Sequence, residues 1–182
     1  GIIVQLPLSK IEKTDEVLSH ISKKKDIDAL LGDEIFVPPT PQAILWILEK
    51  NNISLLGKKI TVVGKGRLVG KPLMKLLDTQ NIPYTALEKG DSVENIISDS
   101  DIIITATGTP SLIKTTMVKS GAVIIDAGTA VEDGKLVGDV ESSLRLHENV
   151  YITPTKGGVG PLTICALFEN VLIAGERGLK LR

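Results

Sequence analysis

The sequence predicts an α/β fold, a Rossmann-like doubly wound parallel sheet, with the remnant of a second α/β catalytic domain at the N-terminus. From residue 59 onward, short β-rich apolar runs alternate with helical stretches, the pattern of a parallel sheet covered by helices. A glycine-rich loop, GKGRLVGKP at residues 64–72, directly follows the first of these runs and opens a helix.

Periodicity and breakers place the elements in order. The opening run, residues 1–8 (GIIVQLPL), predicts a buried parallel strand. Because a strand at residue 1 has no turn signal before it, we expect the sequence to start inside a longer protein. An amphipathic helix is expected over residues 10–24, and after PPTP at 38–41 a linking helix over 42–51. Further strands are expected at 59–63, 83–87, 101–105, 122–126 and 151–153, and further helices at 69–80, 92–98 and 161–175.

Composition excludes several classes of protein. The 182 residues carry a net charge of −1 and 3% aromatics, so nucleic acid is not an expected partner. The longest apolar runs are strand-sized, which argues against a membrane helix. One cysteine and two distant histidines give no metal site, and together these features favour a cytoplasmic protein.

The loop after the first strand of the sheet has the residues of a phosphate site. Gly64 allows a tight turn, Gly66 lets the backbone approach a pyrophosphate, and Gly70 lets helix and strand pack closely. Free N–H groups at the helix start favour phosphate, and Lys65 and Arg67 add positive charge. The alternative is a glycine turn that only joins strand to helix.

The choice of dinucleotide stays open on these residues. Glu88 follows the second strand of the sheet, where an acid accepts the ribose 2′-OH of NAD. Lys65, Arg67 or Lys89 could instead neutralise the 2′-phosphate of NADP.

Other candidate ligand contacts follow later strands. Thr107, Gly108 and Gly128 lie at the carboxyl ends of two strands, where ligands bind in open α/β sheets. The run GGVGPLT at residues 157–163 has three glycines before a proline-started helix, more than a turn needs.

Five ordered motifs resemble one family. They are VQLPL at 4–8, KDID at 25–28, PPTP at 38–41, VGKP at 69–72 and GGVGPLT at 157–163. Together they resemble the methylenetetrahydrofolate dehydrogenase/cyclohydrolase family, the bifunctional FolD-type folate enzymes, along essentially the whole chain.

The resemblance implies an enzyme with a folate cleft between two domains. It would oxidise 5,10-methylenetetrahydrofolate by hydride transfer to NADP, with NAD as the alternative, and hydrolyse the methenyl product to 10-formyltetrahydrofolate, in one-carbon metabolism and purine biosynthesis. A tetrahydrofolate substrate and a homodimer are further expectations. Residues 1–40 would belong to the folate-binding catalytic domain, 41–160 to the NAD(P)-binding domain, and 161–182 to a helix returning to the catalytic domain.

The resemblance also implies residue roles. Gln5 and Asp28 would be catalytic. The expected substrate contacts are Gln5, Leu6, Pro7, Asp28, Gly158 and Pro161. The expected cofactor contacts are Gly64, Lys65, Gly66, Arg67, Val69, Gly70, Thr107, Gly108, Gly128 and Thr163.

Several positions depart from the family pattern. The family's catalytic lysine and its tyrosine partner lie upstream of Gly1. The family's longer segment after Asp28 has no match here, so either this loop is shortened or, as we expect, a mobile segment is missing between Asp28 and Ala29. Lys65-Gly66 replaces Arg-Ser in the phosphate loop, and Lys156 replaces a proline before Gly-Gly. We therefore expect these residues alone to bind cofactor with poor activity. The alternatives are another Rossmann dehydrogenase or a non-catalytic dinucleotide-binding module.

Overall fold

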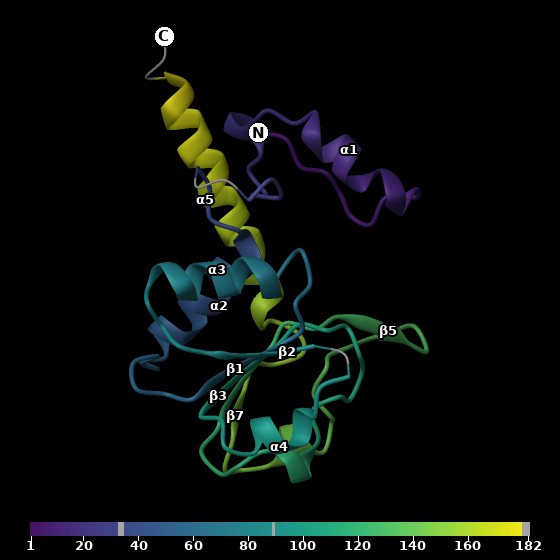
Figure 1. The fold of residues 1–182 in the computed structure, drawn as a ribbon, viewed down its shortest axis with the longest axis vertical. Coiled ribbons are helices and arrows are strands. Elements are labelled where there is room, and N and C mark those ends of the chain that lie inside the picture. The colour runs from purple at the N-terminus through teal and green to yellow at the C-terminus, as the bar shows by residue number, and fades with distance from the viewer. Residues whose placement is uncertain (33–34, 89, 180–182) are drawn as a thin grey trace.

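A five-stranded parallel sheet lies at the centre of the chain (Figure 1), in a computed structural model that describes residues 1–32, 35–88 and 90–179. The strand order is β2-β1-β3-β4-β7. The order of a doubly wound sheet reverses between β1 and β3, so this point is its topological switch. The five strands confirm the predicted ones and are β1 (Ile60–Val63), β2 (Thr85–Leu87), β3 (Ile102–Thr105), β4 (Val123–Asp126) and β7 (Tyr151–Ile152).

Helices cover both faces of this sheet, as predicted. α2 (Pro39–Lys50) and α3 (Gly70–Thr79) pack with Ile102 and Ile104 in one buried cluster. Ile103 points to the opposite face, where it packs with Ile97 of α4 (Val93–Ile97). The short 3₁₀ turns are η1 (Ile11–Lys13), η2 (Lys23–Lys25), η3 (Thr115–Met117) and η4 (Leu144–Leu146).

A small antiparallel hairpin joins β5 (Ala130–Glu132) to β6 (Lys135–Val137) and was not predicted. Asp133 and Gly134 both have positive φ, 49° and 73°, as a type I′ turn requires. The Asp-Gly signal is in the sequence, but its flanking strands are only three residues long and mostly exposed. Their hydrophobic pattern is therefore too short to stand out.

The N-terminal predictions need correction. The helix expected over 10–24 is broken into η1, α1 (Thr14–Ser19) and η2, because Ile11 is 71% and Val17 39% exposed and little apolar surface supports a longer helix. The strand expected over 1–8 is reduced to one bridge between Ile2 and Asp26. A strand needs a hydrogen-bonded neighbour along its length, and the described residues supply only this bridge.

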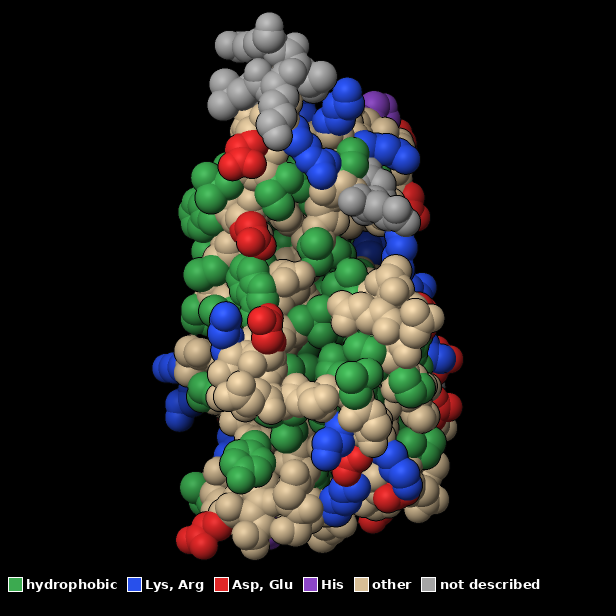
Figure 2. Space-filling model, turned by 90° about the vertical axis from the view of Figure 1, so that its left-hand side faces the viewer, with side chains coloured by type: hydrophobic (Ala, Val, Ile, Leu, Met, Phe, Trp, Pro, Cys, Tyr) green, Lys and Arg blue, Asp and Glu red, His purple; other side chains and the backbone are tan. Residues whose placement is uncertain are grey.

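α5 (Val159–Leu179) begins two residues before the predicted start and runs along α2, away from the sheet (Figure 1). The buried Asn170 side chain joins it to the N-terminal segment by donating 2.8 Å hydrogen bonds to the carbonyls of Ile27 and Val37. Its outer face is apolar and exposed, at Ile164, Phe168, Val171 and Leu172 (Figure 2).

The same helix bears on the expectation that no segment crosses a membrane. Among the described residues, α5 alone is long and apolar enough to cross a membrane, with a mean hydropathy of 1.3 over an 18-residue window. This criterion uses length and composition only, and helices packed against protein also meet it. α5 packs against α2 and against the buried cluster around Ile27, so this protein itself covers part of its surface.

Candidate functional site

The glycine-rich loop leaves β1 at the switch point of the sheet. Gly64 has a φ of +101°, and a methyl group on it would lie 2.7 Å from the carbonyl oxygen of Ala106, the residue that follows β3. A methyl group on Gly70 would lie 1.9 Å from the carbonyl oxygen of Gly64. Neither position can hold a side chain without moving the loop. Gly66 has open space, with its nearest contact at 3.9 Å.

This loop delivers the N-terminus of α3 to the edge of the sheet. Val69, at the N-cap, makes no side-chain cap hydrogen bond, but the Lys71 N–H donates to the Gly66 carbonyl at 3.0 Å and Pro72 has no N–H. Among the first three residues of α3, Gly70 therefore keeps the one N–H with no backbone partner in the described part of the chain, and the helix dipole favours an anion beside it. The open space at Gly66 lies in the same loop, so the loop fits a phosphate group.

Two basic residues of the loop have acidic partners. Lys65 Nζ lies 3.2 Å from Glu88 Oε1, which joins the ends of β1 and β2. The Arg67 guanidinium lies 2.6 Å from Asp15 Oδ1 of α1 and is thereby directed to the N-terminal segment. Lys89 lies outside the described residues.

The Lys65–Glu88 pair is expected to set the preference between NAD and NADP. Glu88→Gln should raise the affinity for NADP relative to NAD, because it removes negative charge near a 2′-phosphate and leaves Lys65 unpaired. Lys65→Gln should lower the same ratio, each change being roughly tenfold. Dissociation constants for both dinucleotides give the ratio, with Glu49→Gln at the far end of α2 as the control. Equal ratios in all four proteins would contradict this role.

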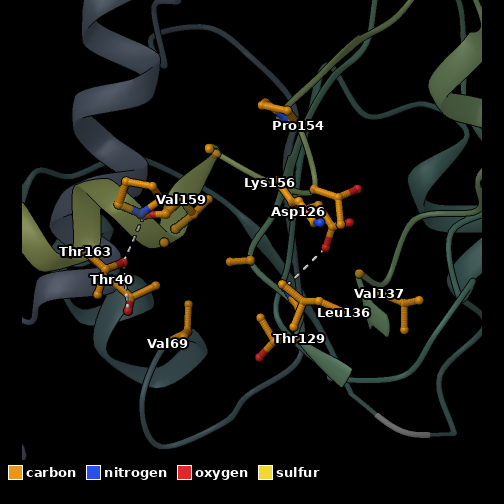
Figure 3. Close-up of a pocket in the computed structure, with 18 of the residues that line it drawn as sticks. Thr40, Val69, Asp126, Thr129, Leu136, Val137, Pro154, Lys156, Val159 and Thr163 are labelled. Atoms are coloured by element: carbon orange, nitrogen blue, oxygen red, sulfur yellow. Dashed lines mark hydrogen bonds between the residues drawn. The ribbon is translucent and has the colours of Figure 1, made fainter. Parts of the chain in front are cut away.

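A cavity of about 510 Å³ lies beside the phosphate loop at the carboxyl edge of the sheet. Figure 3 shows Val69, Val159 and Thr163 on one side and Asp126 and Val137 on the other. Of the sequence-predicted contacts, those that line it are Val69, Gly128, Gly158, Pro161 and Thr163. The cavity thus brings together the phosphate loop, the end of β4 and the loop before α5.

A buried charged cluster supports the wall formed by the end of β4. Asp126 Oδ2 bonds the Arg145 guanidinium, which also donates to the Thr153 carbonyl at 2.8 Å. Asp126 Oδ1 accepts the Asp139 N–H at 3.0 Å and the Gly128 N–H at 3.2 Å. Burial raises the pKa of Asp126, against the lowering effect of these hydrogen bonds and of Arg145. This cluster holds the ends of β4 and β7 together.

Sequence reasoning missed Asp139 and Arg145 as parts of the site. Asp139 Oδ2 accepts the Thr105 hydroxyl at 2.6 Å and the Thr107 N–H at 2.7 Å, so it fixes the end of β3 as well. No motif contains both residues. The only signal in the sequence is that an aspartate and a glycine lie close together twice. They are Asp126 and Gly128 at the end of β4, and Gly138 and Asp139 further along the chain.

The expected folate residues lie elsewhere in the structure. Gln5 is exposed and donates to the Leu6 carbonyl at 3.1 Å, and the Leu6–Pro7 peptide bond is cis. Asp28 is half-buried in the N-terminal segment, and its pKa is raised by burial and by the neighbouring Asp26 carboxylate. None of these residues lines the cavity.

Asp28→Asn is expected to stabilise the fold at neutral pH. A folded-state pKa above the unfolded value means that holding the carboxylate ionised is unfavourable in the folded chain. The gain, within about 1 kcal/mol, should be fully present above the raised folded-state pKa of Asp28. It should vanish as the pH falls below the unfolded value of about 3.9. Urea unfolding across this pH range measures it, and a loss of stability at pH 7 would contradict the assignment.

Comparison with known proteins gives the family context of this geometry. Residues 38–178 match the tetrahydrofolate dehydrogenase/cyclohydrolase NAD(P)-binding domain. The chain is 40% identical to the bifunctional protein FolD of Macrococcus caseolyticus, with 97% of this chain and 66% of the relative aligned. It is 38% identical to that of Bacillus subtilis, with 98% and 67% aligned. The chain therefore spans about two thirds of the length of the curated relatives it matches.

Solved structures resemble the chain over the same span. A Trypanosoma brucei methylenetetrahydrofolate dehydrogenase-cyclohydrolase, complexed with NADP and an inhibitor, has a TM-score of 0.87 at 32% identity. The bifunctional enzyme FolD from Campylobacter jejuni also has a TM-score of 0.87, at 34% identity. Both alignments cover 97% of this chain and 67% of the solved chain.

Proposed function

Because this chain belongs to the tetrahydrofolate dehydrogenase/cyclohydrolase family, we propose that it forms the NADP-binding part of an enzyme that oxidises 5,10-methylenetetrahydrofolate. The enzyme would also hydrolyse the methenyl product to 10-formyltetrahydrofolate. The observation that carries the proposal is the cavity between the phosphate loop and the loop before α5. Residues 126–129, at and after the end of β4, form one wall of it, against which a flat ring would lie.

The chain's own residues bind and orient the reactants. The N-terminus of α3 would hold the pyrophosphate, and the segment 157–161 would hold the nicotinamide end against the end of β4. The bound dinucleotide supplies the hydride acceptor. Gly158 and Pro161, which line the cavity, would contact the folate, as the family resemblance implies.

The folate half of the site belongs to residues 1–40 and to sequence that the relatives carry beyond the match. Asp28 would pair with the pterin ring and Gln5 would lie beside the reacting carbon, as the family resemblance implies. The aligned stretch of 187 positions in the Macrococcus relative exceeds the 182 residues here, so that relative has residues without a counterpart. We assign this difference to the segment after Asp28, where the family resemblance implies a longer loop.

The exposed apolar face of α5 has a place in the same proposal. Ile164, Phe168 and Leu172 are more than half exposed, at 57%, 64% and 68%. We propose that the folate-binding domain, to which α5 returns, covers these three side chains. A homodimer in the cytoplasm completes the proposal, and light scattering after size-exclusion chromatography tests the dimer.

The activity test uses the natural protein that contains this chain. With methylenetetrahydrofolate and NADP or NAD, we expect reduced cofactor to form, followed by decay of methenyl absorbance through hydrolysis. The 182 residues alone should bind dinucleotide and turn over poorly, because the family's lysine is not among them. No reduced cofactor with either dinucleotide would contradict the dehydrogenase assignment. If reduced cofactor forms but the methenyl product is not hydrolysed, only the cyclohydrolase assignment is contradicted.

A further inference from the structure

Two carboxylates lie against glycines that line the cavity. A methyl group on Gly128 would lie 2.0 Å from Asp139 Oδ1, and a methyl group on Gly138 would lie 2.0 Å from Asp126 Oδ2. Both glycines line the cavity. Asp126 itself lines the cavity and Asp139 lies behind Gly128, so both carboxylates act on whatever occupies this space.

Only one of these charges is neutralised. The Arg145 guanidinium bonds Asp126, and Asp139 has only the neutral donors Thr105 and Thr107 on its Oδ2. The Asp139 side chain is 0% exposed, and its Oδ1 has no hydrogen-bond partner within the described part of the chain. Two carboxylates and one guanidinium leave one excess negative charge in the cluster, and Asp139 is the carboxylate that the guanidinium does not bond.

The orientation of a bound dinucleotide follows from the sheet. The Lys65–Glu88 pair at the ends of β1 and β2 marks the adenosine side. The cavity extends in the other direction, between Val69 and Val159 on one side and the end of β4 on the other. A dinucleotide whose pyrophosphate lies at α3 therefore places its nicotinamide over the end of β4, against Gly128.

We infer that the buried carboxylate of Asp139 stabilises the oxidised nicotinamide, whose ring is positively charged, relative to the neutral reduced ring. The inference rests on the proposed function. Asp139 touches no ligand and acts through space, so it is a positioning and electrostatic residue of the site. It would also stabilise a cationic folate product held against the same wall.

The positive charge of Lys156 acts against this effect, but its influence on a ligand in the cavity is weaker than that of Asp139. Among the described residues it is the only cationic side chain that lines the cavity. It is exposed, so water and salt screen its charge. The Asp139 carboxylate is fully buried, where an effective dielectric constant of about 20 or less leaves its field much stronger.

Asp139→Asn tests the inference by binding. Asparagine keeps an oxygen that can accept from Thr105 and Thr107 but removes the charge. Titration of the 182-residue chain with oxidised and with reduced NADP should show the ratio of the two dissociation constants, oxidised over reduced, rising about tenfold. Glu141→Gln is the matched control, because its carboxylate bonds Thr115 and does not line the cavity. Its ratio should equal that of the wild type.

A second measurement needs no variant at position 139. NAD and benzamide adenine dinucleotide differ mainly in the ring, which is cationic in the first and neutral in the second. The wild-type chain should bind NAD about tenfold more tightly. Equal affinities, or an unchanged ratio in folded Asp139→Asn, would overturn the inference. A folded wild-type chain that binds no dinucleotide would instead contradict the proposed function.

Discussion

Gly70→Ala is expected to destabilise the fold and to weaken dinucleotide binding at least tenfold. The new methyl group would lie 1.9 Å from the Gly64 carbonyl oxygen and 3.0 Å from the Lys65 Cα. Backbone atoms cannot move aside as a flexible side chain does, so the phosphate loop must shift away from α3. Overpacking of this kind costs about 1–3 kcal/mol. Urea unfolding and NADP titration measure the two losses.

Substitutions at two other glycines separate the loss of stability from the loss of dinucleotide binding. Gly175→Ala, on α5 with no atom within 4 Å, should raise stability by about 0.5–1 kcal/mol and leave binding unchanged. Gly66→Ala has room for its methyl group and should leave stability unchanged. It should still weaken binding, because the methyl group occupies the space assigned to phosphate. Wild-type affinity in Gly70→Ala would show that the loop does not hold the ligand.

Arg145→Met is expected to cost about 3–5 kcal/mol of stability at neutral pH, the range for breaking a buried ion pair. The Asp126 side chain is 3% exposed, and without the guanidinium its charge has no cationic partner in the cluster. Burial already raises the pKa of Asp126, so ionisation opposes folding above the raised pKa and ceases to do so below the unfolded value. The cost should therefore shrink as the pH falls.

The control for this variant is an exposed ion pair. Arg67 and Asp15 are 46% and 84% exposed, so Arg67→Met should cost less than about 1 kcal/mol at any pH. Urea unfolding of both variants at pH 7 and under mildly acidic conditions gives the comparison. A cost for Arg145→Met that is small, or equal at both pH values, would contradict the role given to Asp126.

The sheet and its helices could be predicted because their signals are local. Ile102, Ile103 and Ile104 form one apolar run, and a strand of this kind is buried whatever its neighbours are. The opening run from Gly1 is also mostly apolar, yet the structure gives it one bridge to Asp26. Amino-acid composition indicates that a segment can form a strand. Whether it does so depends on a neighbouring strand with which it can form hydrogen bonds.

The candidate site divides in the same way. Glycine loops that follow strands are visible in sequence, so Val69, Gly128 and Pro161 were expected at the cavity that they line. The pairing of Arg145 with Asp126 joins residues 19 apart through the ends of two strands. Neither residue type nor spacing marks such a pair. Only the folded structure places the Asp139 carboxylate behind Gly128.

Hydrogen exchange of this chain with and without NADP tests the central claim most directly. If the cavity is the dinucleotide half of a folate dehydrogenase, saturating NADP should slow exchange in three segments: 64–72, 126–129 and 157–163. These three segments are the phosphate loop, the end of β4, and the first turn of α5 with the two residues before it. Exchange in the β5–β6 turn and at the C-terminal end of α5 should stay unchanged. Protection elsewhere, or no protection in a folded chain, would contradict the account.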